Sequence, residues 1–201
     1  MVKINTMAKL ANLLRFVELL NRYRAVKREI FANSEDRLEN DVEHSYQLTM
    51  LAWYIVEAER LSLDKNLLLK YALVHDLVEA YAGDTFAFAD ENKRQEKVEQ
   101  EKKALGRLRR EFAEFKELTE LIGEYEERKN PESRFIYALD KLQPTLNIYL
   151  DGGRSWRRDG VTLQMILNYK NDLIAKVPEL KQYFDELIFL IKQNEKALFN
   201  P

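Results

Sequence analysis

The sequence contains no cysteine, which excludes disulfides, a thiolate metal site and a cysteine nucleophile. Glycine and proline, which interrupt regular structure, are scarce, with six and four residues among 201. No apolar run reaches the roughly 18 residues that a membrane-spanning helix needs. The net charge is only −2, so no overall field favours nucleic acid or a membrane surface as a partner.

What remains is a globular composition, with 46% apolar and 33% charged residues. A chain of this length can bury a sizeable core as one domain. The N-terminus lacks the apolar region of a signal peptide, so we expect a cytoplasmic protein. Between residues 93 and 128 acids interrupt every basic cluster, which indicates a solvated helix surface and no nucleic-acid site.

Apolar residues follow helical spacing nearly everywhere, and no window alternates as a strand would. The fold class expected is therefore all-α, as a single domain over 1–201, with a core at about 10–150 and a C-terminal helical extension at 161–199. The expected helices are 6–31, one beginning at Asn40, 64–83, one within 93–128, one beginning at Pro131, 161–176 and 179–198.

Two segments outside these helices are expected to be loops. Residues 32–39 are polar, and residues 154–158 form the most cationic short stretch, with Arg154, Arg157 and Arg158. The basic stretch suits a solvated loop, a substrate-phosphate contact or an interface, and the sequence leaves these open. In the first helix, the spacing predicts one buried stripe: Leu10, Leu13, Leu14, Val17 and Leu20.

The stretch that organises the chain is the apolar helix expected at 64–83, which Gly83 should end. His75 and Glu79 lie one turn apart on it, with Asp76 beside them. Burying such ionisable groups without partners costs several kcal/mol each. A bound metal ion is the simplest compensation.

Two further residues extend this hypothesis. His44 falls in the first turn of the helix that Asn40 should cap, and Asp140 lies among apolar residues of a later helix that Pro144 should bend. Two imidazoles and two carboxylates suit one divalent transition metal ion: Mn²⁺, Co²⁺, Fe²⁺, Ni²⁺ or Zn²⁺. Glu79 would then be free to transfer a proton, and Lys141 is either a phosphate contact or a solvated neighbour of Asp140.

These residues belong to an ordered set of short motifs. In chain order they are Glu43-His44-Ser45, Leu73-Val74-His75-Asp76-Leu77-Val78-Glu79, Gly83-Asp84-Thr85 and Leu139-Asp140-Lys141. The set resembles the HD-domain superfamily of metal-dependent phosphohydrolases, and within it the branch of 5′-deoxynucleotidases. The resemblance covers roughly residues 10–150.

The resemblance implies an HD-domain helical bundle with the C-terminal helices packed on it. It also implies hydrolysis of deoxynucleoside 5′-monophosphates to deoxynucleoside and phosphate. The metal ligands it implies are His44, His75, Asp76 and Asp140. It assigns catalysis to Glu79 and places Asp84 and Thr85 in the substrate site, where we expect Asp84 to be a second catalytic acid. Substrate binding is expected of Arg22 and Tyr23 from the resemblance, and of Lys141 from its charge.

The expected partner is a nucleotide substrate, and the expected assembly is a homodimer. The dimer rests on the resemblance and on four apolar residues that exceed what the terminal helix of a monomer needs. These are Phe184, Leu187, Phe189 and Leu190.

Two alternatives to the deoxynucleotidase stay open. The first is an HD phosphohydrolase for another nucleotide (a triphosphate, a cyclic dinucleotide or guanosine tetraphosphate). The second is a non-catalytic helical interaction protein with a structural metal. Glu79 argues against the second alternative, because a structural site needs no extra acid.

Overall fold

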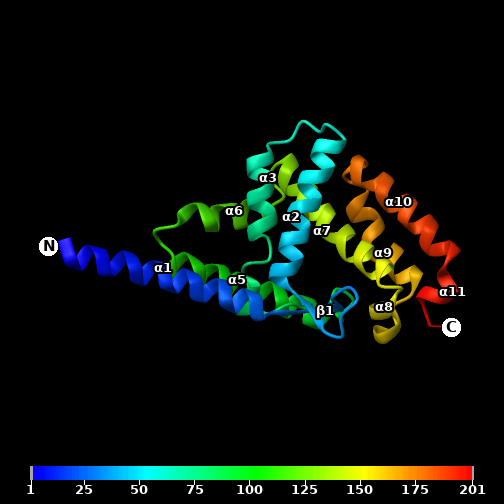
Figure 1. Ribbon diagram of the computed structural model, residues 1–201, viewed down its shortest axis with the longest axis horizontal. Coiled ribbons are helices and arrows are strands. Elements are labelled where there is room, and N and C mark those ends of the chain that lie inside the picture. Colours follow the sequence, from blue (N-terminus) through cyan, green and yellow to red (C-terminus); the bar gives the residue numbers. More distant parts are fainter. Residues whose placement is uncertain (1, 201) are drawn as a thin grey trace.

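The structure is a computed structural model that describes residues 2–200, with side chains from residue 8 onward. It is helical throughout apart from one small β-hairpin, as the sequence predicts for the fold class (Figure 1). The helices are α1 (Val2–Ala25), α2 (Asp41–Ala58), α3 (Lys65–Val74), α4 (Glu79–Ala82), α5 (Glu91–Glu111), α6 (Lys116–Glu126), α7 (Pro131–Leu150), α8 (Arg154–Asp159), α9 (Leu163–Ile174), α10 (Pro178–Gln193) and α11 (Glu195–Leu198). The strands are β1 (Lys27–Phe31) and β2 (Leu38–Asn40).

Side-chain caps fix where the main helices begin. Asn40 accepts from the backbone of Glu43, and Glu43 bonds back to Asn40, which confirms the predicted capping box of α2. Asp64 caps α3 with a single bond, in which its side chain accepts from the backbone N–H of Leu67. Asn130 forms a second capping box at α7, where Pro131 occupies the first turn.

Helix α7 runs through the middle of the protein and contacts α2, α3, α6, α9 and α10 (Figure 1). The larger apolar core surrounds it and includes Leu68, Tyr71, Leu139 and Phe184. A second, smaller core joins the end of α1 to α5 and α6. The functional motifs lie where α2, α3 and α7 meet. None of the described helices is long and apolar enough to span a bilayer.

The prediction that residues 6–31 form one helix is wrong. Helix α1 ends at Ala25, and β1 then pairs antiparallel with β2, so part of the expected loop 32–39 is also a strand. The physical reason is burial with a period of two, which brings Arg28 and Ile30 inward while Lys27 and Glu29 stay exposed. Helix α8 likewise replaces the loop expected at 154–158.

The single helix expected at 64–83 is interrupted. Helix α3 ends at Val74, and α4 begins only at Glu79. Between them the backbone makes tighter bonds, from Leu77 to Val74 and from Glu79 to Asp76. This turn changes the direction in which the side chains of the motif project.

The apolar stripe predicted to be buried on α1 is exposed. Leu10, Leu13, Leu14, Val17 and Leu20 are each between 43% and 58% exposed. Figure 1 shows that the first half of α1, which carries Leu10 and Leu13, extends beyond the rest of the protein. Of the terminal-helix residues proposed for a dimer interface, Phe184 and Leu187 are buried in the core, while Phe189 and Leu190 are exposed.

Candidate active site

Four residues from three parts of the chain converge on one point. His44 comes from the first turn of α2, His75 and Asp76 follow α3, and Asp140 lies in the middle of α7. Each offers one donor atom, and these four atoms all lie within 4.8 Å of one another. Ligands about 2.0–2.2 Å from one ion would span a similar distance.

The two imidazoles face each other through their Nε2 atoms, which are 3.2 Å apart. The Nδ1 of His75 donates to the carbonyl oxygen of Ala72 at 3.0 Å, which leaves the lone pair of its Nε2 directed at the cluster. The Nε2 of His44 lies 3.0 Å from Oδ1 of Asp140. Two ring nitrogens in this arrangement can both coordinate one cation that lies between them.

On its outer side His44 faces Glu39, with 3.6 Å between Nδ1 and Oε1. Both atoms are buried without a hydrogen-bond partner among the described residues. An N–H directed at Glu39 leaves Nε2 of His44 as a donor to a metal, in the carboxylate–histidine arrangement common at metal sites. Burial raises the pKa of Glu39 to about 7.

The charge of the cluster also suits a cation. Burial lowers the pKa of His75, but Asp76 and Asp140 outweigh it and raise that pKa to about 10. Burial and Arg28 instead lower the pKa of His44 to about 4. The two carboxylates therefore favour one positive charge among the four residues, which a divalent ion supplies in place of the proton.

Arg28 of the β-hairpin contacts the acidic residues beside the cluster. Its Nη1 donates to Oδ2 of Asp76 at 2.9 Å and lies 3.3 Å from Oδ1 of Asp41. Its Nε is 3.7 Å from Glu39. The hairpin therefore delivers one cation that holds three buried or half-buried acids.

Glu79 lies at the start of α4 and is 1% exposed. Its Oε1 accepts from Nζ of Lys97 on α5 at 2.8 Å, whereas its Oε2 is buried without a partner among the described residues. Burial and the charge of Asp76 raise the pKa of Glu79 well above its usual range, and Lys97 opposes that rise. A raised pKa makes the protonated form of this carboxyl group easier to reach, which suits a proton-transfer role.

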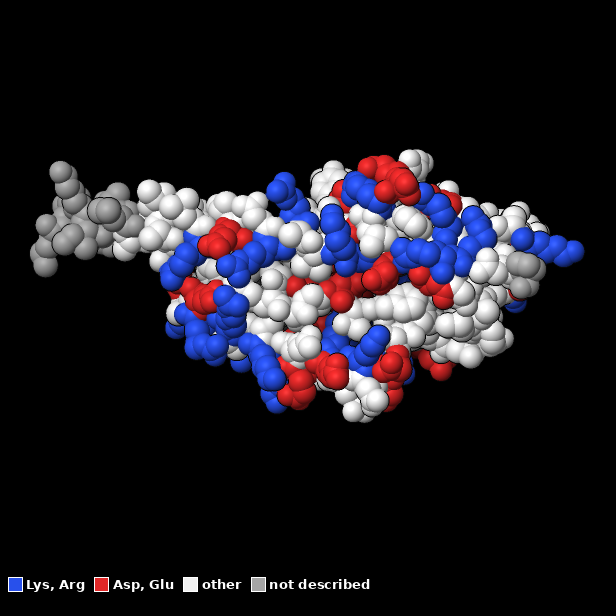
Figure 2. Space-filling view, turned by 90° about the horizontal axis from the view of Figure 1, so that it is seen from below, with Lys and Arg blue, Asp and Glu red and all other residues white. Residues whose placement is uncertain are grey.

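A cavity opens in front of the cluster. The predicted residues that line it are Asp76, Glu79, Asp84, Thr85, Asp140 and Lys141, and the two histidines lie behind them. Its other wall is apolar and aromatic, with Phe86, Phe88 and Tyr169 in edge-to-face contact. Figure 2 shows acidic side chains along a central hollow, with Lys and Arg on its sides.

Two of the predicted substrate residues lie elsewhere. Arg22 is exposed, pairs with Glu18 at 2.8 Å and is not part of the cavity lining. Tyr23 is buried, and its hydroxyl lies 2.7 Å from Oγ of Ser45, the residue after His44. The structure thus places Tyr23 beneath the first turn of α2, where it supports the backbone next to His44.

Comparison with known proteins agrees with this geometry. The family model described as HD domain matches residues 20–181. The chain belongs to the HD domain family. The matched residues include His44, His75, Asp76 and Asp140.

The HD-domain protein has curated relatives. It is 33% identical over 140 residues to 5′-deoxynucleotidase HDDC2 of Mus musculus, and the aligned region covers 68% of each chain. It is 33% identical over 139 residues to the protein of the same name from Bos taurus, covering 67% of this chain and 65% of the other. These matches span about two thirds of each relative.

A solved structure is similar over nearly the whole length. It is that of a predicted metal-dependent phosphohydrolase from Magnetospirillum magnetotacticum, with a TM-score of 0.80 and 29% identity. The match covers 96% of this chain and 98% of that one. An HD-domain phosphohydrolase from Listeria innocua, at 17% identity and a TM-score of 0.63, shows the same fold.

Sequence reasoning missed two cavity residues of this HD domain, Arg28 and Lys97. Arg28 was hidden by the helix expected at 6–31, although Ile30-Phe31 followed by Asn33-Ser34 is a strand-and-turn signal. Lys97 is one of many lysines in a charge-dense helix, and no local pattern distinguishes it. Only the packing of α5 on α4 brings it to Glu79.

Proposed function

We propose that the protein hydrolyses deoxynucleoside 5′-monophosphates to deoxynucleoside and orthophosphate, as a metal-dependent phosphomonoesterase. The observation that carries this proposal is the donor cluster of two histidines and two aspartates beside the buried, half-paired Glu79. The mammalian relatives named 5′-deoxynucleotidase support the substrate class.

We assign His44, His75, Asp76 and Asp140 as ligands of one divalent transition metal. The fit rests on the facing Nε2 atoms and on the outer contacts of both rings. When bound, such an ion neutralises phosphate charge and lowers the pKa of a water molecule by several units. Imidazole and carboxylate donors suit Mn²⁺, Co²⁺, Fe²⁺, Ni²⁺ and Zn²⁺.

We assign proton transfer to Glu79. As a carboxylate it takes a proton from the attacking water through Oε2, and as an acid it returns a proton to the leaving 5′ oxygen of the nucleoside. Lys97 fixes the other oxygen and thereby the direction in which Oε2 points. Asp84 lines the same cavity, and we assign it as a second catalytic acid.

Cationic groups around the cavity are suited to hold the phosphate. Arg28 and Lys141 both line it, and Lys141 donates to Oδ2 of Asp140 at 2.7 Å. A phosphate group that displaces part of these contacts keeps the charges paired. Thr85 and Asp84 follow α4 and line the same cavity, and we assign Thr85 to substrate binding.

A phosphate-release screen tests the proposal. Purified protein loaded with each candidate metal is given nucleoside monophosphates, triphosphates, a cyclic dinucleotide and guanosine tetraphosphate. Orthophosphate from deoxynucleoside monophosphates is expected to exceed every other product. Pyrophosphate or triphosphate release would identify the other HD reactions, and tight metal binding without any turnover would indicate a structural metal.

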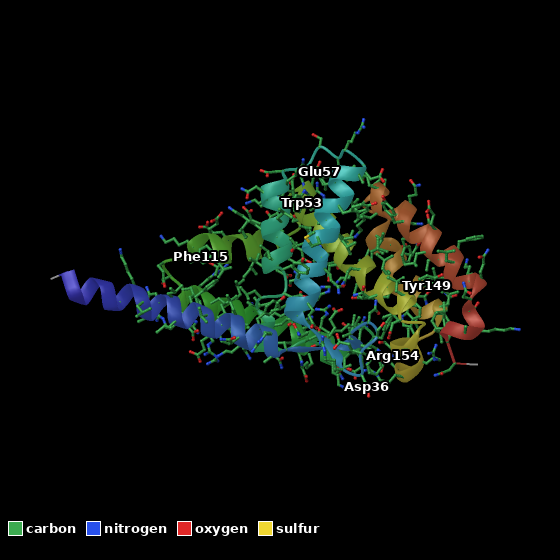
Figure 3. All side chains as sticks on the ribbon, viewed as in Figure 1. Asp36, Trp53, Glu57, Phe115, Tyr149 and Arg154 are labelled. Atoms are coloured by element: carbon green, nitrogen blue, oxygen red, sulfur yellow. The ribbon has the colours of Figure 1, made fainter. Side chains whose placement is uncertain are left out.

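We also propose a homodimer formed through the exposed face of α1 and α2. The stripe on α1 continues into an apolar groove lined by Phe16, Met50, Leu73 and Phe115 among others. Tyr46 adds exposed aromatic surface along α2. Trp53 on the same helix is also exposed (Figure 3). A contiguous exposed apolar surface of this kind is typical of protein interfaces.

Light scattering tests the dimer. Wild type is expected at twice the chain mass at micromolar concentration, and Leu13→Glu is expected to lower that mass toward a monomer. Leu150→Glu is the matched control, because Leu150 is also exposed but lies at the end of α7. A monomeric wild type, or equal effects of both substitutions, would contradict the proposed face.

A further inference from the structure

Lys170 of α9 is a buried lysine in the wall of the active-site cavity. Its side chain is covered so that 6% of the residue is exposed. Its Nζ donates to Oγ1 of Thr145 at 2.7 Å. An ammonium group carries three N–H donors, so this one bond leaves two of them available.

The other two lysines of the cavity each have an acid. Lys97 pairs with Glu79, and Lys141 pairs with Asp140, at 2.8 Å and 2.7 Å. No carboxylate of the described residues lies within ion-pair distance of Lys170. The charged groups that act on it are Lys141 and Arg28, which oppose its charge, and Asp140, which favours it.

A buried ammonium without an acid is costly, and burial lowers the pKa of Lys170 to about 7. An apolar side chain of the same length would fill this position at less cost. An anion that enters the cavity would change this balance, because it supplies the missing charge and accepts the two remaining N–H groups.

We propose that Lys170 is an anion-binding residue of the cavity, which donates to an oxygen of the substrate phosphate and of released orthophosphate. The choice of phosphate as the anion rests on the proposed function. Thr145 lies five positions after Asp140, so Lys170 approaches the cavity about 7.5 Å further along α7 than the metal cluster. Lys141, the residue after Asp140 on α7, lines the same cavity, so the cavity wall holds a second ammonium group.

Orthophosphate binding to the metal-loaded protein tests the inference without turnover. Calorimetric titration of Lys170→Met is expected to give a dissociation constant about 10-fold or more weaker than wild type, the scale of one charge-assisted hydrogen bond. Lys170→Arg is expected to restore part of the affinity. Lys176→Met removes the same charge from an exposed lysine just after α9 and is expected to change nothing.

Thermal unfolding separates binding from a structural role. Without phosphate, Lys170→Met is expected to unfold at or above the wild-type temperature, because it removes a buried charge. Saturating phosphate is expected to raise the melting temperature of wild type more than that of the variant. If Lys170→Met melts lower and the phosphate-induced shift is unchanged, Lys170 is structural and the inference is wrong.

The two proposals fail differently. If wild type releases phosphate from deoxynucleotides but Lys170→Met binds orthophosphate normally, only the inference about Lys170 is overturned. If wild type hydrolyses none of the monophosphates but Lys170→Met binds orthophosphate more weakly than wild type does, the anion site stands and the proposed reaction does not. Should Lys170→Met not fold, Lys170→Gln is titrated in its place, because it also removes the charge, and it is expected to weaken orthophosphate binding in the same direction.

Discussion

Three of the four residues in the proposed metal cluster have a contact on the side away from the other donors. His75 is held by the carbonyl of Ala72, His44 faces Glu39, and Asp76 accepts from Arg28. Glu79 has no place in this set, because its contact is with Lys97. Ligand and proton-transfer residue should therefore separate experimentally.

We expect Asp140→Asn to lose metal and activity in parallel, since it replaces an anionic donor with a neutral one, and excess metal should restore part of both. Glu79→Gln keeps the shape of the side chain but cannot transfer a proton. It should retain metal while kcat falls about 10²-fold or more. Metal analysis beside steady-state kinetics measures both effects. Loss of metal in Glu79→Gln would make Glu79 a ligand instead.

The ion pair with Lys97 predicts a shift of the pH profile. Lys97 lowers the raised pKa of Glu79, so Lys97→Met should raise that pKa further. If Glu79 must be ionised to accept a proton, the acidic limb of the kcat profile moves to higher pH. Lys102→Met, on an exposed lysine of the same helix, is the control. An unmoved acidic limb would exclude Glu79 as the titrating base.

The convergence of His44, His75, Asp76 and Asp140 could be predicted from the sequence because each is chemically distinct and lies in a recognisable motif. Arg28, Lys97 and Lys170 could not, since their roles arise from contacts across long sequence separations. The Nζ of Lys170 reaches Thr145 from 25 positions away. Helical periodicity carries no information on such contacts.

Among the elements, helix starts were easier to predict than helix ends. Asn40, Asp64 and Asn130 each cap a helix with a local side-chain bond that the sequence displays. The end of α1 at Ala25 depends instead on the pairing of β1 with β2. The interruption after Val74 is likewise without a stop residue in the sequence between Val74 and Glu79.

The cap of α2 should matter for the metal because His44 lies in its first turn. Asn40→Ala is expected to cost about 1 kcal/mol of stability, as is Asn130→Ala at the matching cap of α7. Only Asn40→Ala should also weaken metal affinity, since Asp140 lies ten positions after Asn130. Denaturant unfolding and metal titration of both variants test this. Equal metal affinities would show that the first turn of α2 is held by other contacts.

For the whole molecule, a tightly bound ion should contribute to stability. Excess chelator is expected to lower the melting temperature, because an ion at 100 times its dissociation constant stabilises the native state by about 2.7 kcal/mol. That corresponds to roughly 5–10 °C for a chain of this size. Calorimetry with and without chelator measures it, and Asp140→Asn should show a smaller difference.

The spacing of the cluster along the chain has a consequence for how the protein acquires its ion. His44 and Asp140 are 96 positions apart, and the contact between them forms only after α7 has packed against α2. We therefore expect the donor set to be absent from early folding species and the proposed ion to bind a chain that is already folded. Stopped-flow experiments should show that metal slows unfolding but leaves the refolding rate unchanged. Faster refolding in metal would instead place the cluster in the folding nucleus.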